Sequence, residues 1–187
     1  RMVYDTELSI SQNLLSLLNS TKKFDGFDLD YEIENVEKIE GIEYSESQKK
    51  AIKTALEEKL MIITGGPGTG KTTIIKAIIM IAKNLRLKFT LCAPTGRAAK
   101  RMEESTGQES STIHRLLGYK SFSEEMLLDF NEENPLDTDL IIVDEVSMVD
   151  IYLMNNLLKA IKKDAMLIFV VDSDQFPSVG PGNVIND

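Results

Sequence analysis

Residues 65–72 read GGPGTGKT, and this pattern constrains the fold more than any other feature of the chain. An apolar, β-prone run at 60–64 precedes the pattern, and a helix-compatible stretch at 72–85 follows it. Glycines let successive backbone N–H groups turn inward around phosphate oxygens at the positive end of the next helix. The pattern therefore predicts a strand, a phosphate-binding loop and a helix, in that order.

The same segment carries side chains that suit a bound nucleotide. Lys71 supplies a positive charge for the β- and γ-phosphates, and the Thr72 hydroxyl can reach a Mg²⁺ ion. The alternative is a glycine-rich turn with a chance Lys-Thr pair, which the flanking strand and helix disfavour. The residues expected to hold the nucleotide here are Gly66, Gly68, Thr69, Gly70, Lys71, Thr72 and Thr73.

A second apolar run, residues 140–143, ends in Asp144-Glu145. A carboxylate that directly follows a buried strand can hold Mg²⁺ through the water shell of the ion, and its neighbour can orient and deprotonate a water molecule. We therefore predict that Asp144 serves the metal and Glu145 acts as the base. The alternative is an exposed strand end or helix start, where acidic residues are common.

Apolar runs alternate with helical patterns along most of the chain. The expected strands are residues 60–64, 88–93, 139–143 and 165–171. The expected helices are residues 7–18, a helix opening at Ser45, and residues 72–85, 96–104, 112–117 and 150–162. Strands separated by helices indicate an α/β fold with a parallel sheet, and strands that are apolar throughout indicate helices on both faces.

Two segments are harder to interpret. Residues 25–43 are acidic and fit either a strand or a helix, and a glycine stop at Gly41 favours the helix. Between Gly118 and Asp137 the alternation breaks, and residues 119–122 and 127–130 are expected to pair as a small hairpin.

Composition narrows the class of protein. With 187 residues, 42% hydrophobic and 27% charged, the chain has the composition of an ordinary globular domain with a real core. Its one cysteine, Cys92, lies in a strand-like run and is expected to be a buried, inert thiol. No apolar run is long enough for a bilayer and no signal peptide opens the chain, so the expected location is cytoplasmic, with no membrane partner.

Charge is distributed unevenly. The net charge is −9, but residues 61–120 hold 10 basic and 3 acidic residues, a local balance of +7. Residues 1–60 hold 8 and 13, and residues 121–187 hold 3 and 14. Some of these bases are expected to be ordinary solvated helix residues, Lys100 and Arg101 among them. The middle third is nevertheless where phosphate-binding surfaces are expected.

Five motifs appear in a fixed order. They are YSESQ ending at Gln48, APTGRAAKRMEE at 93–104, TIHRLLG at 112–118, DEVSMVD at 144–150 and DSDQFPSVGPGNV at 172–184. With GGPGTGKT, this set resembles the first motor domain of superfamily 1 DNA helicases of the RecD-like group, relatives of the exodeoxyribonuclease V alpha subunit. The resemblance implies a RecA-like P-loop NTPase domain at 44–187, preceded by a short helical lead-in at 1–43, with 119–130 as a small hairpin insertion.

The resemblance also implies roles for individual residues. Gln48 would read the adenine edge of ATP, although Ser45-x-x-Gln48 also fits a capping box. Gln175 would sense the γ-phosphate and is counted with Lys71, Asp144 and Glu145 as catalytic. The implied DNA contacts are Pro94, Thr95, Arg97, Thr112 and His114. A lone histidine such as His114 is otherwise a packed or surface residue.

The activity implied by the resemblance is that of a 5′–3′ ATP-dependent DNA helicase, with ATP and Mg²⁺ as cofactors and single-stranded DNA bound through its backbone. The resemblance also implies a second motor domain after residue 187, which would supply an arginine finger, and a place in recombination or repair, with subunits of a nuclease complex among the partners it suggests. We expect the present chain to be an excised piece with weak activity on its own.

Two positions depart from the RecD-like pattern. This chain has Val171-Asp172 where the group has glycine and aspartate, and Phe176 where it has leucine. A β-branched residue predicts different packing of the strand end beside Asp144. The alternative functions are a P-loop ATPase of the loader or partitioning type, and a nucleotide-gated interaction module that has lost catalysis.

Overall fold

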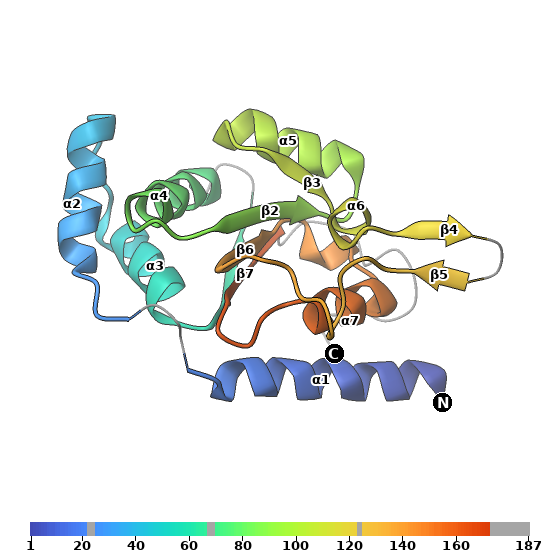
Figure 1. Ribbon diagram of the computed structural model, residues 1–187. Coiled ribbons are helices and arrows are strands. Elements are labelled where there is room, and N and C mark those ends of the chain that lie inside the picture. The colour runs from blue at the N-terminus through green and yellow to red at the C-terminus, as the bar shows by residue number, and fades with distance from the viewer. Residues whose placement is uncertain (22–24, 67–69, 123–124, 173–187) are drawn as a thin grey trace.

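The centre of the molecule is a parallel sheet, as the apolar runs predict. The computed structural model describes residues 1–21, 25–66, 70–122 and 125–172. Within them, five parallel strands pair in the order β1-β7-β6-β2-β3 (Figure 1). The strands are β1 (Leu60–Gly65), β2 (Phe89–Ala93), β3 (Ser110–Thr112), β6 (Leu140–Val143) and β7 (Met166–Asp172).

The four predicted strands are confirmed, and β3 is an addition. Its residues, Ser110, Ser111 and Thr112, are all half-buried, and it pairs with β2 at the outer edge of the sheet. An edge strand of three polar residues has no apolar run and no alternation, so the sequence pattern gives no signal for it.

Helices cover both faces of the sheet, and the side chains of each strand alternate between the two. On one face lie α2 (Leu29–Glu40), α3 (Glu46–Glu57), α4 (Lys71–Asn84) and α5 (Gly96–Thr106). On the other lie α1 (Met2–Asn19), α6 (Ile113–Leu117) and α7 (Ile151–Lys159). Ile142 packs in the first core, and Ile141 and Val143 pack in the second.

The helix α2 begins and ends for local reasons. The ambiguous segment at 25–43 contains α2, as the favoured interpretation predicts. The Asp28 side chain caps the helix by accepting from the Tyr31 N–H at 3.1 Å, and Gly41 ends it with a φ of 67°. Along the opposite face of the sheet, α1 packs on α7 and buries Ile10 and Leu17 (Figure 1). No helix in the described ranges is long and apolar enough to cross a membrane.

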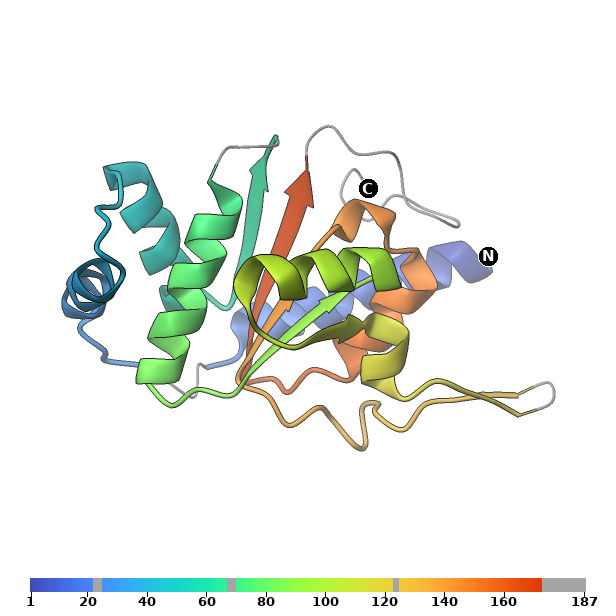
Figure 2. The same ribbon diagram turned by 90° about the horizontal axis from the view of Figure 1, so that it is seen from above.

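A hairpin interrupts the layers between α6 and β6. Its strands, β4 (Lys120–Phe122) and β5 (Glu125–Leu127), are antiparallel and extend away from the sheet (Figures 1 and 2). The predicted hairpin is confirmed, but the prediction of 127–130 as its second strand is wrong beyond Leu127. Asp129 and Phe130 instead donate their N–H groups to the Leu117 carbonyl at 3.1 and 3.2 Å, and Leu128 and Phe130 pack on the core.

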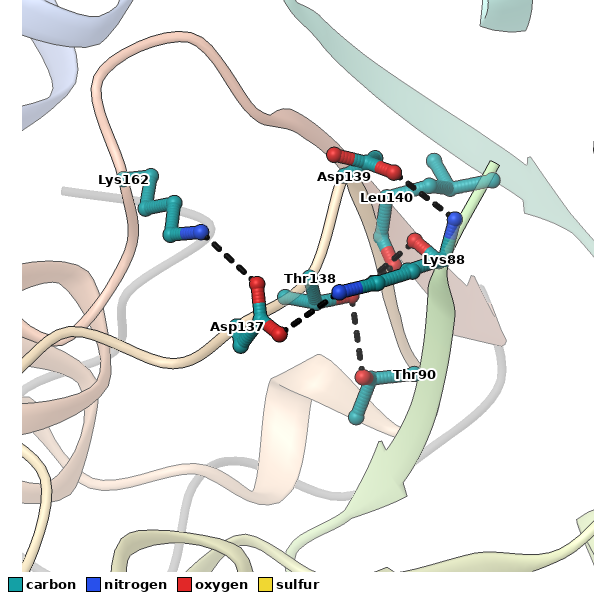
Figure 3. Close-up of polar contacts among 7 residues, drawn as sticks. All are labelled: Lys88, Thr90, Asp137, Thr138, Asp139, Leu140 and Lys162. Atoms are coloured by element: carbon teal, nitrogen blue, oxygen red, sulfur yellow. Dashed lines mark hydrogen bonds and ion pairs between the residues drawn. The ribbon is translucent and has the colours of Figure 1, made fainter. Parts of the chain in front are cut away.

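Polar side chains gather where β2 and β6 begin (Figure 3). We call this group the amino-end network, and it comprises Lys88, Thr90, Asp137, Thr138, Asp139 and Lys162. The Asp137 carboxylate accepts from Lys88 Nζ at 2.7 Å and from Lys162 Nζ at 2.9 Å. Asp139 accepts from the Lys88 N–H at 2.8 Å, and the Thr90 and Thr138 hydroxyls are 3.0 Å apart. The network ties the chain before β6 to the start of β2.

Candidate nucleotide site and nucleic-acid surface

The predicted phosphate loop joins β1 to α4, as expected. Gly70 precedes the first residue of α4 and has a φ of 85°, a left-handed conformation that glycine adopts without strain. Its carbonyl accepts from the Ile74 N–H at 3.1 Å, which starts the helix. Of the predicted loop residues, Gly68 and Thr69 lie outside the described residues.

Lys71 is the first residue of α4, and its side chain lies over the carboxyl ends of two neighbouring strands. Its ammonium group donates to the Gly65 carbonyl at 2.6 Å and to the Val171 carbonyl at 3.3 Å. Carbonyl oxygens carry no net charge, so these contacts hold the amine in place without neutralising it. Lys71 is thus positioned to bind an anion at this edge of the sheet.

Val171 does not disturb the strand end. β7 stays in register with β1 through Val171 and Asp172, which pair with Thr64 and Gly65. The valine side chain is buried in the core on the α7 side. The strand is therefore regular up to its last residue.

Asp144 and Glu145 follow β6 and point to the same place. The Asp144 N–H donates to the Cys92 carbonyl at 2.9 Å, which fixes the strand end against β2. Burial raises the pKa of Asp144, and the negative charge of Glu145 adds to this. The Glu145 N–H, which donates to Asp144 Oδ1 at 2.8 Å, and the cations of Lys71 and Arg101 act in the opposite direction.

Glu145 adopts a backbone conformation that is uncommon for a residue with a side chain. Its φ is 49° and its ψ is 44°, and it leads into a short 3₁₀ turn, η1 (Val146–Met148), which the sequence pattern does not predict. Glu145 is only 7% exposed. Such strain persists where the surrounding structure imposes it, and it occurs often at functional sites.

These groups line one cavity with a volume of about 170 Å³. The strand ends and α4 contribute Lys71, Thr72, Asp144, Glu145 and Asp172. The facing wall comes from α5, with Arg101, Met102, Ser105 and Thr106. The sequence prediction missed the α5 wall, because α5 is known to face the phosphate loop only once the sheet order is known.

The residues present fit a Mg²⁺ ion held together with a nucleotide. In the described ranges, no group of three or more His, Cys, Asp or Glu side chains could hold a metal. Mg²⁺ at nucleotide sites, however, takes one or two protein oxygens and completes its shell with phosphates and water. Thr72 and Asp144 offer one hydroxyl and one carboxylate in the same cavity.

Gln48 forms the capping box that was the alternative to adenine recognition. Its Oε1 accepts from the Ser45 N–H at 2.9 Å, and Ser45 Oγ accepts from the Gln48 N–H at 3.2 Å. A Cβ atom built on Gly70 would lie 3.1 Å from Gln48 Nε2, so the amide end also touches the phosphate loop. The two roles are compatible, because an amide oxygen accepts two hydrogen bonds.

The two predicted DNA segments lie side by side. Ala93 of β2 pairs with Thr112 of β3, so Pro94 and Thr95 follow one strand end while Thr112 closes its neighbour. Thr95 caps α5 by accepting from the Ala98 N–H at 3.2 Å, and Thr112 caps α6 by accepting from the Arg115 N–H at 3.1 Å.

Two of the predicted DNA-binding side chains, Arg97 and His114, are both exposed but differ in their surroundings. Arg97 is exposed on the first turn of α5. His114 is also exposed, and its ring stands edge-on to Tyr119 at 4.8 Å between centroids. The structure therefore brings both segments to the same edge as the nucleotide cavity.

Three further predictions concern Cys92, Gln175 and Arg101. Cys92 is a fully buried free thiol, as expected, and burial raises its pKa to about 12. Gln175 lies outside the described residues. Arg101 is exposed, as expected for a solvated helix residue, and in addition its Nη1 lies 3.5 Å from Glu145 Oε1.

A parallel sheet with a phosphate loop after β1 and acidic residues after β6 defines a P-loop nucleotide-binding domain of RecA-like architecture. The chain belongs to the family described as "AAA domain", whose model matches residues 48–181. The resemblance to RecD-like helicases is confirmed by relatives and by solved structures.

Among the relatives, the ATP-dependent RecD2 DNA helicase of Deinococcus radiodurans is 45% identical over 138 residues, which are 74% of this chain and 19% of that protein. The RecBCD enzyme subunit RecD of Haemophilus influenzae is 37% identical over 169 residues, covering 78% of this chain and 26% of that protein. The chain thus spans about a fifth to a quarter of the length of these two relatives. A structure of two Pif1 helicases on forked double-stranded DNA matches with a TM-score of 0.54 and 25% identity, over 74% of this chain and 36% of the other.

Proposed function

We propose that the chain is the ATP-binding first motor domain of a DNA helicase that moves 5′ to 3′ along single-stranded DNA. One observation carries the proposal. The cavity at the ends of β1, β7 and β6 and the predicted DNA segments at the ends of β2 and β3 share one edge of one sheet. The name of one relative, the ATP-dependent RecD2 DNA helicase, supports a helicase activity.

In this proposal, ATP lies over the phosphate loop with its triphosphate against Lys71. Thr72 and Asp144 hold Mg²⁺, which supplies charge stabilisation when bound. Glu145 accepts the proton of the attacking water, since its carboxylate lines the cavity beside Asp144. Gln175 would report the loss of the γ-phosphate.

The proposal requires parts that lie outside this sequence. In it, a second motor domain of the same parent protein supplies an arginine finger and the remaining DNA contacts. The helicase works in recombination or repair, with nuclease subunits as possible partners. Because ATP and DNA are its ligands, we propose that it is cytoplasmic.

Two substitutions in the full-length protein test the proposal. Lys71→Ala removes the cation of the phosphate loop and is expected to abolish both nucleotide binding and unwinding. Arg97→Ala is expected to abolish unwinding and to weaken single-stranded DNA binding, with a salt dependence lower by about one ion, while nucleotide binding is retained. Lys76→Ala, an exposed lysine on the same helix as Lys71, is the matched control.

The measurements are fluorescent-nucleotide titration, DNA binding at several salt concentrations, and strand separation. If Arg97→Ala unwinds DNA normally, the proposed DNA surface is wrong. If the unmodified protein hydrolyses ATP with no response to single-stranded DNA, a loader or partitioning ATPase fits better. If it binds ATP without turnover, a nucleotide-gated interaction module fits better.

A further inference from the structure

An ion pair links the helix that follows the predicted DNA segment to the predicted catalytic base. Arg101 Nη1 lies 3.5 Å from Glu145 Oε1. The two side chains differ in exposure, 61% for Arg101 and 9% for Glu145. An exposed cation therefore reaches inward to a buried carboxylate, and the cation is the partner that is free to leave.

The backbone around Glu145 is held in one conformation. The left-handed conformation and the hydrogen bond from the Glu145 N–H to Asp144 Oδ1 fix where the side chain starts. The contact with Arg101 then engages one carboxylate oxygen. The lone pairs of Oε1 that face the guanidinium are less available to take a proton from water.

Arg101 also shares a helix face with Arg97. Residues four apart on a helix lie on the same face, so the two side chains start from neighbouring positions on α5. The first turn of α5 carries the predicted DNA contacts, and its later turns line the nucleotide cavity. Figure 2 shows α5 as one continuous helix along the edge of the sheet that β2 and β3 form.

We propose that Arg101 restrains Glu145 until DNA is bound. A DNA phosphate that engages this face of α5 offers the guanidinium a second anionic partner, and guanidinium groups bind phosphate with two parallel hydrogen bonds. The exchange of partners frees the Glu145 carboxylate to activate water. The inference rests on the proposed function and makes Arg101 a positioning residue that couples DNA binding to ATP hydrolysis.

The test compares Arg101→Ala with the unmodified full-length protein. Turnover of ATP without DNA is expected to rise roughly two- to fivefold, the effect of losing one partly exposed ion pair. Stimulation by single-stranded DNA is expected to fall by a similar factor. The KM for ATP and the dissociation constant of a fluorescent ATP analogue are expected to change by less than about twofold.

Two further variants serve as comparisons. Arg101→Lys keeps a cation and is expected to retain most of the restraint. Lys100→Ala is the matched control, because Lys100 is the adjacent exposed residue and pairs with Glu104 at 3.9 Å instead of with the site. It is expected to behave as the unmodified protein.

Three results would overturn the inference. These are equal loss of turnover with and without DNA, nucleotide affinity weakened tenfold or more, and an unchanged stimulation ratio. Glu145→Gln separates this failure from failure of the proposed function. If Glu145→Gln hydrolyses ATP normally, Glu145 is not the base and the proposed mechanism is wrong. If Glu145→Gln is inactive and Arg101→Ala behaves as the unmodified protein, only the restraint is wrong.

Discussion

The two edges of the sheet use charged side chains in opposite ways. At the amino edge, Asp137 lies between two lysines, and each of its oxygens accepts a hydrogen bond (Figure 3). At the carboxyl edge, Lys71 rests on neutral backbone carbonyls, and Glu145 meets a guanidinium at the longer distance of 3.5 Å. At the amino edge, opposite charges are in close contact with one another. At the carboxyl edge, the charged groups are held in place but remain able to interact with a bound ligand.

The pKa directions show the same contrast. The hydrogen bonds from Lys88 and then Lys162, with the charges of both, lower the pKa of Asp137 to about 2. Burial raises the pKa of Asp144. Shifts that arise from burial in a cleft are common at functional sites, while a carboxylate stabilised by paired cations contributes to folding. We infer that the amino edge contributes to stability, whereas the carboxyl edge is where the proposed ligands bind.

The largest effect is expected at Gln48, which has both a structural contact, in the capping box of α3, and a proposed role in binding the nucleotide. If Gln48 recognises adenine as proposed, Gln48→Ala is expected to reduce the preference for ATP over GTP about tenfold, because it removes the proposed hydrogen bonds to the base. Ser45→Ala removes the cap alone, so it is expected to cost about 1 kcal/mol of stability and leave the nucleotide preference unchanged. Competition titrations and denaturant unfolding measure the two effects.

If Gln48→Ala keeps its nucleotide preference and only loses stability, the capping box is the whole role of Gln48. The functional difference between the two edges would then be smaller than we infer, since a residue that contacts the phosphate loop would only stabilise the fold.

The positions of Lys71, Thr72 and Asp144 at the carboxyl edge could be predicted from the sequence, because each belongs to a short local motif. Lys71 and Thr72 follow glycines, and Asp144 follows an apolar strand, so each is placed by its immediate neighbours. The contact between Arg101 and Glu145 joins two distant segments, and only the sheet order brings them together. Nothing in the sequence near Arg101 or Glu145 predicts this contact. The spacing of four residues between Arg97 and Arg101 shows only that these two share a helix face.

The amino-end network was not predicted for the same reason. It depends on three segments, before β2, before β6 and after α7, whose polar residues look like ordinary loop residues in the sequence. β3 and the turn at η1 were missed because short polar or irregular elements lack periodicity. The predicted second strand of the hairpin begins two residues late, because Leu128 and Phe130 are apolar for core packing and not for a strand.

A moderate effect is expected at Thr138, the most buried polar residue of the amino-end network, at 2% exposed. Thr138→Val keeps the shape but removes a hydroxyl that contacts the Thr90 hydroxyl and the Lys88 and Leu140 carbonyls. The expected cost is about 1 kcal/mol of unfolding free energy, with nucleotide affinity unchanged. Denaturant unfolding and nucleotide titration check both parts.

Thr90→Val and the double variant complete a mutant cycle for Thr138. The two single effects are expected to exceed the effect of the double variant when summed, because both remove the same contact. Strict additivity, or a loss of nucleotide affinity in Thr138→Val, would contradict a purely structural role for this edge.

The smallest expected effect is the pH dependence of Asp137. Its pKa is lowered on folding, so its contribution to stability is complete above the unfolded value of about 4 and is lost as pH falls toward the folded value of about 2. Asp137→Asn is therefore expected to lower the melting temperature slightly between pH 5 and 8, and this difference should shrink between pH 4 and 2. Carboxyl NMR should give a titration midpoint near 2 for Asp137, with Asp25→Asn as an exposed control for the melting experiment. A midpoint near 4 would show that the two lysines do not hold the carboxylate in solution, and the amino edge would then lose its main distinction from the carboxyl edge.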